Sequence, residues 1–165
     1  MSDPLATYLE DHLAGASAAI DLLQSLQDQH AGEPLGPVAA GWLEEITNDR
    51  KTLLGLIERV EHGPHAGKEA AAWLAEKVSR MKLGRVSKGD LGTFQALETL
   101  SLGILGKRSL WKALAEAARE DPRLGGLDYD RLIRSAEEQF DSVEEQRLEF
   151  GRKALSPLVS QPERR

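Results

Sequence analysis

The chain has 165 residues and a formal net charge of −6, from 27 acidic and 21 basic side chains. A length of this order suits one domain that buries roughly 70% of the surface its unfolded chain exposes. The acidic balance argues against nucleic acid as a partner. Cysteine is absent, which excludes disulfide bonds, thiolate metal sites and thiol catalysis.

The sequence carries no membrane or export signal that we recognise. The longest nearly continuous apolar run, residues 100–106, is far shorter than the ~20 residues of a membrane-spanning helix. The first residues lack the basic and then apolar order of a secretory signal. We therefore expect a soluble, cytoplasmic protein with one domain over residues 1–158 and a frayed polar tail over 159–165.

The first segment predicts a long amphipathic helix. Asp3 suits the N-cap and Pro4 the first helical position. Apolar residues recur at spacings of three and four, and His12 falls on their stripe. The small residues 15–19 would let another helix approach closely, either within the fold or across a homodimer.

Three more long helices follow. After a loop rich in glycine and proline at residues 31–37, a second stripe carries Asp49 among apolar residues. A shorter amphipathic helix is predicted over residues 68–81. Asp90 suits the N-cap of the third long helix, and its charge-free stretch between Glu98 and Lys107 predicts the most enclosed part of the fold. The last long helix is expected to start at Asp128.

No segment alternates apolar and polar residues as a strand does, so the fold class is all-α. Four helices of about 40 Å suit a bundle with side-by-side packing. Short loops join helices one and two, and helices three and four, as antiparallel neighbours. The long connection over residues 61–90 could return the chain along the bundle, so that helix three runs parallel to helix two.

This single-crossover arrangement is the one found in ferritin-like folds. Together with the phrases YLEDHLAGASAAIDLL in helix one and ALETLSLGILGKRSLW in helix three, it resembles the ferritin-like superfamily of four-helix bundles. The similarity is to small bacterial members without an assigned activity. It implies a ferritin-like four-helix bundle with a long, helix-containing crossover between helices two and three.

The usual di-iron centre of that superfamily does not fit this sequence. Such a centre takes one glutamate from each of two helices and a Glu-x-x-His pair from each of the other two. No histidine of the chain follows a glutamate at this spacing; the four are His12, His30, His62 and His65. The resemblance therefore implies the fold without its iron chemistry, and we expect no cofactor beyond, at most, a single divalent metal.

Polar residues on the apolar stripes need partners, because burying an unpaired charge is unfavourable. Counted from Gly32 in the first loop, His12 lies 20 residues back and Asp49 17 residues forward. On antiparallel helices their heights then differ by only about 4.5 Å. We therefore expect His12 and Asp49 to lie at the same level of the bundle.

Their third partner depends on the topology. With the crossover, Lys107 reaches the level of Asp49, and the group is a buried polar network of His12, Asp49 and Lys107. Without it, Glu98 reaches that level, and the carboxylates with the imidazole offer the ligands of a mononuclear metal site. The long connection favours the network.

Three functions remain open at this stage. The leading interpretation is a non-catalytic structural or interaction protein, with dimerisation as one form of it. The first alternative is a metalloprotein with a single site at His12, Asp49 and Glu98. The second is a protein that binds a small molecule in the core of the bundle. No catalytic residue is assigned, because no motif for nucleophilic, phosphate-binding or metalloprotease chemistry is present.

Overall fold

The computed structural model describes residues 3–62 and 86–156, and these form four long helices. The helices are α1 (Pro4–Gln29), α2 (Leu35–His62), α4 (Asp90–Ala117) and α5 (Tyr129–Leu155), with a short 3-10 turn, η2 (Pro122–Leu124), before α5. The fold is an all-α four-helix bundle. Within the described ranges, no helix is both long and apolar enough to cross a membrane. The helix predicted over 68–81 and the tail predicted over 159–165 lie outside the described residues.

Helix starts follow local capping chemistry. Asp3 caps α1 by accepting a hydrogen bond from the Leu5 amide, and Pro4 opens the helix as predicted. Asp128 caps α5 through the Arg131 amide. The prediction for α4 was wrong by one residue: Gly89 is its N-cap, at a positive φ of 87° that glycine adopts without strain, and Asp90 is the first helical residue.

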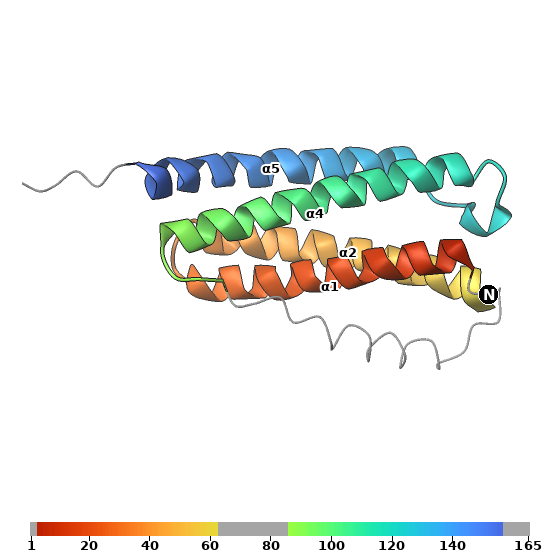
Figure 1. The fold of residues 1–165 in the computed structure, drawn as a ribbon, viewed down its shortest axis with the longest axis horizontal. Helices are drawn as coiled ribbons and strands as arrows, with labels where there is room; N and C mark the ends of the chain where they lie inside the picture. The colour runs from red at the N-terminus through yellow and green to blue at the C-terminus, as the bar shows by residue number, and fades with distance from the viewer. Residues whose placement is uncertain (1–2, 63–85, 157–165) are drawn as a thin grey trace, which may run out of the picture.

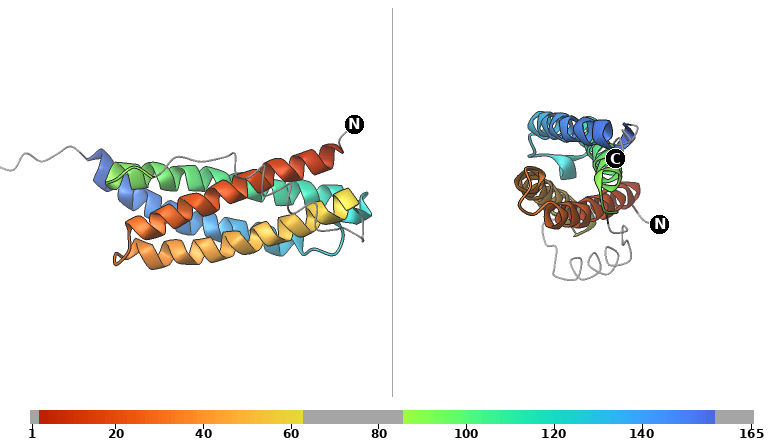
Figure 2. Two further views of the ribbon diagram at one scale, coloured as in Figure 1. Left: turned by 90° about the horizontal axis from the view of Figure 1, so that it is seen from below. Right: turned by 90° about the vertical axis from the view of Figure 1, so that its left-hand side faces the viewer.

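Two contacts fix the direction of α4. His30, which follows α1, hydrogen-bonds to Thr93 in the first turn of α4. At the other end, Arg59 near the end of α2 donates to the Gly125 carbonyl, just beyond α4. α4 therefore runs in the same direction as α2 (Figure 1). Seen end on, α1 and α2 form one antiparallel pair and α4 and α5 the other (Figure 2).

The apolar core consists of two clusters, one toward each end of the bundle. The first includes Leu53, Leu110 and Trp111, and the second includes Ile46 and Ile104. Members of both line a single pocket between α1, α2 and α4. The interior is therefore interrupted halfway along the bundle, at the level where polar residues were expected.

The charge-free stretch of α4 is not the most enclosed part of the fold, so that prediction was wrong. Leu102 is 65% exposed, and Thr99 and Gly103 are also exposed. The reason is that α4 packs with one face against α5 and the core, while the face that carries Thr99 and Leu102 has no helix over it in the described part of the chain. Gly103 is exposed because it lies on the wall of an open pocket. Absence of charge did not mean burial here.

Candidate functional site

The polar centre of the bundle is the contact between Asp49 on α2 and Lys107 on α4. The Lys107 ammonium donates to the Asp49 carboxylate at 2.5 Å, and each side chain is only 14% exposed. Lys107 also donates to the amide oxygen of Gln139 on α5. The Gln139 amide nitrogen in turn donates to Asp49 at 3.4 Å. Three helices are thus joined by one closed set of hydrogen bonds.

The structure brings together two of the three residues predicted for this network. Lys107 lies at the level of Asp49, as the topology with a parallel α2 and α4 requires. His12 lines the pocket beside them, but no hydrogen bond joins it to Asp49 or Lys107. Gln139, which is 4% exposed, completes the set instead. The sequence offered no signal for Gln139, because counting along α5 does not fix which of its polar residues faces inward.

Glu98 lies apart from these residues. It is exposed on α4 and is not part of the pocket wall. Its charge contributes to raising the pKa of Arg147 on α5, after the larger effects of the neighbouring Glu144. Over residues 3–62 and 86–156, no three histidine or acidic side chains are grouped so that they could hold a metal ion.

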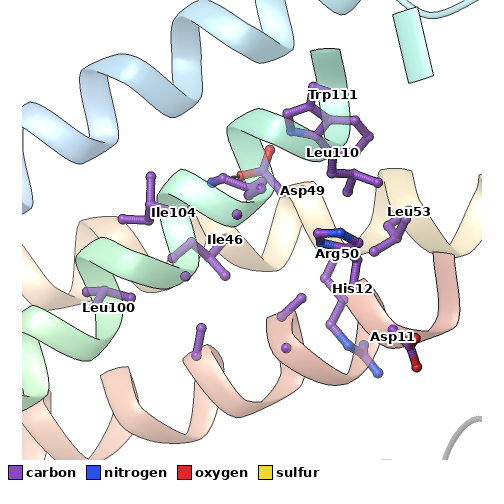
Figure 3. A pocket seen from close by; sticks show the side chains of 16 residues that line it. Asp11, His12, Ile46, Asp49, Arg50, Leu53, Leu100, Ile104, Leu110 and Trp111 are labelled. Atoms are coloured by element: carbon purple, nitrogen blue, oxygen red, sulfur yellow. Dashed lines mark hydrogen bonds and ion pairs between the residues drawn. The ribbon is translucent and has the colours of Figure 1, made fainter. Parts of the chain in front are cut away.

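The pocket beside the network has a volume of about 370 Å³ and is walled by three helices. His12 from α1, Leu53 from α2 and Leu110 from α4 surround it (Figure 3). A volume of this order falls within the range of small-molecule sites. The walls are mostly apolar, with a few polar groups among them, which is also typical of such sites.

Small residues make the room for this pocket. Gly15 on α1 and Gly103 and Gly106 on α4 all lie on its wall, and a Cβ added at any of them would meet no atom within 4 Å. Ala16 and Ala19 continue the wall on α1. The run at residues 15–19 was expected to allow a close helix contact. Gly15, Ala16 and Ala19 leave open space toward α4, while Ser17 and Ala18 of the same run are buried.

His12 sits on this wall with its imidazole half-buried. Burial lowers the pKa of His12 below its usual value, while the nearby Asp11 carboxylate acts in the opposite direction. Its ring packs edge-on against Tyr8, with 4.7 Å between the ring centroids. No hydrogen bond joins the imidazole to another residue in the part of the chain that the structure describes. The ring is therefore neutral near pH 7 and free to bond to a ligand.

Trp111 provides a second polar group without a partner. It is 1% exposed and lines the pocket, and its indole N–H is buried without a hydrogen-bond acceptor in the described structure. The same holds for the Ser101 hydroxyl and the Arg108 Nε, but neither residue lines the pocket. An unpaired buried donor is unfavourable by about 1–3 kcal/mol. The nitrogen itself is buried out of reach of a water molecule, so it does not open onto the pocket.

A second buried histidine was missed. His30 is only 6% exposed and joins Glu33 at 2.7 Å and Thr93 at 2.9 Å through its two ring nitrogens. It also packs edge-on against Phe150 of α5. His30 thus ties the first loop to α4 and α5. Its position next to a predicted loop gives no sign of burial, since sequence alone does not show that α4 starts beside that loop.

The comparisons with known proteins give no family for the chain. No family model matches it, and no match is found among curated proteins or among solved structures.

Proposed function

We propose that this chain is a non-catalytic helical bundle of ferritin-like topology that binds a small, largely apolar molecule in the pocket between α1, α2 and α4. The observation that carries the proposal is the pocket itself: about 370 Å³ of space lined by Leu53, Leu110 and Trp111 in the middle of the bundle. The pocket opens to solvent, since Asp11, Gly15 and Gly103 on its wall are exposed, so a molecule can enter it from outside.

The ferritin-like part of the proposal rests on helix direction. α2 and α4 have 28 residues each and are therefore about 42 Å long. Because they run the same way, α4 starts at the end of the bundle opposite to the one where α2 ends. A single long connection between the second and third helices is the feature that ferritin-like folds share.

Binding rather than catalysis is supported by the state of the polar groups at the pocket. The Asp49 carboxylate is held by Lys107 and Gln139, so it is not free to accept a proton from a substrate without breaking that network. Among the described residues, His12 has no carboxylate in hydrogen-bond contact to orient its ring, as a general base has in a catalytic triad. What the wall offers is apolar surface with a few polar side chains among it, those of Asp11, His12 and Arg50.

The proposal is tested by titration with 4-propylphenol, an apolar molecule of about ten non-hydrogen atoms. At roughly 0.3–0.5 kcal/mol per atom, the free energy of binding is about 3–5 kcal/mol, which corresponds to a Kd of about 0.2–6 mM. Chemical shifts of a ¹⁵N-labelled sample detect saturable binding in this range. The shifts should cluster at the facing turns of α1, α2 and α4.

Two leucine variants give the control. Gly106→Leu places a side chain into the pocket, whereas Gly55→Leu makes the same change on α2 at a position that does not line this pocket and where a Cβ also meets no atom within 4 Å. Binding should weaken at least tenfold in the first variant and stay unchanged in the second. Equal affinity in both, or no saturable binding by the unaltered chain, would refute the proposal.

A further inference from the structure

The ion pair at the centre of the bundle separates two pockets. Besides the pocket between α1, α2 and α4, a second pocket of about 380 Å³ is lined by α2, α5 and the residues just before α5. Asp49 lies on the wall of both. Of the two pockets, Lys107 lines the first and Gln139 the second. Because the Lys107 ammonium donates to the Gln139 amide oxygen, at this level the two pockets are divided by one layer of side chains.

The Lys107 side chain is held in place by two acceptors. Its ammonium donates to the Asp49 carboxylate at 2.5 Å and to Gln139, whose own amide nitrogen donates to Asp49 at 3.4 Å. An apolar chain passes this layer only by displacing the ammonium, which leaves the Asp49 carboxylate without its cation at a site where it is 14% exposed. Lys107 is therefore a fixed part of the pocket wall.

The energetics favour a closed layer over a longer ligand. Separating a largely buried ion pair is unfavourable by a factor on the order of 10² in an equilibrium constant. Each methylene group that moves from water into an apolar site tightens binding only about fourfold. Two further methylene groups, together worth about 16-fold, do not offset the loss of the pair.

We infer that Lys107, fixed by Asp49 and Gln139, forms the inner end of the binding pocket and limits the length of the apolar molecule that the pocket takes. This inference rests on the proposed function and adds a length limit to its ligand class. A molecule longer than the space between the exposed mouth, beside Gly15 and Gly103, and Lys107 leaves its excess methylene groups in water. The network thus determines specificity as well as joining three helices.

A series of 4-alkylphenols, from propyl to heptyl, measures this limit because all members share one ring. Titrations followed by ¹⁵N chemical shifts give a Kd for each member. In the unaltered chain, the Kd should fall about fourfold per added methylene group while the pocket has room, and then stay constant. The readout is the chain length at which the Kd stops falling.

Two double variants remove the same charges but differ in bulk. Asp49→Ala with Lys107→Ala deletes most of the layer, whereas Asp49→Leu with Lys107→Met replaces it with apolar side chains of similar size. In the alanine pair, the Kd should continue to fall for at least two further methylene groups, by about 16-fold. In the leucine and methionine pair, the length limit should equal that of the unaltered chain. An unchanged limit in the alanine pair, or an equally extended limit in both pairs, would refute the inference.

The unaltered chain gives a second test that does not depend on the folding of a variant. Nuclear Overhauser effects should join protons of 4-pentylphenol to the side-chain methylene groups of Lys107. They should not reach the methyl groups of Leu132, which lines the second pocket and not the first. Effects to Leu132 would refute the length limit and leave the proposed function standing. If no member of the series binds saturably, both are refuted.

Discussion

Removing either partner of the Asp49–Lys107 ion pair should destabilise the fold strongly. Breaking a buried ion pair by deleting one partner typically lowers the free energy of unfolding by about 3–5 kcal/mol, because the remaining charge is left buried. Here each side chain is 14% exposed, and Gln139 remains as a hydrogen-bond partner. We therefore expect a smaller loss, about 2–3 kcal/mol, for Asp49→Leu and for Lys107→Met.

The double variant decides whether this reasoning is correct. Replacing both charges with apolar side chains leaves no stranded ion, so the double variant should lose less than either single variant, under about 1 kcal/mol, and far less than the sum of the two single losses. Urea denaturation followed by circular dichroism measures all three values. If the single losses add to within about 0.5 kcal/mol, the two residues do not interact energetically and the network described here is refuted.

Three further changes test other parts of the structure. Since burial lowers the pKa of His12, the unfolded chain binds more protons than the folded one below about pH 6.5, and stability should fall between about pH 7.5 and 5. Urea denaturation across that pH range should show a smaller fall in the free energy of unfolding for His12→Gln than for the unaltered chain. An equal fall would show that His12 is not the group responsible. His30→Ala should lower the free energy of unfolding by about 2–3 kcal/mol, because it removes packing and the hydrogen bonds to Glu33 and Thr93. Glu33→Ala should lower it by less than about 1 kcal/mol. Equal losses in the two variants would count against a role for His30 in joining the first loop to α4. Gly103→Ala should raise the free energy of unfolding by about 0.5–1 kcal/mol and with it the thermal midpoint, because glycine is unfavourable within a helix and the added Cβ meets open space. A lowered midpoint would show that the pocket wall has no room at this position.

The sequence predicted those parts of the fold that depend on local chemistry. The caps Asp3 and Asp128 mark their helices because side-chain oxygens satisfy free amides within a few residues. The level of Asp49 followed from helical rise alone, and the pairing with Lys107 then followed once α4 was taken to run parallel to α2. These steps need only distances along the chain.

The remaining features depend on how helices rotate about their own axes, which counting along the chain does not fix. Gln139 joins the network and His12 does not, because small differences in rotation decide which side chains meet. Leu102 is exposed although its neighbourhood is uncharged, since no described helix covers that face of α4. The unpaired indole of Trp111 has no sequence signal at all, because an apolar stripe does not show where the N–H group points.

Contacts between a bound molecule and the methyl groups of the pocket test the central claim most directly. Nuclear Overhauser effects should join the ring protons of 4-propylphenol to the methyls of Ile46, Ile104 and Leu110, which come from both core clusters and two helices. The same effects should be absent in Gly106→Leu. Effects to methyls outside the pocket alone, or none at saturating ligand, would contradict the account of this bundle as a small-molecule binding protein.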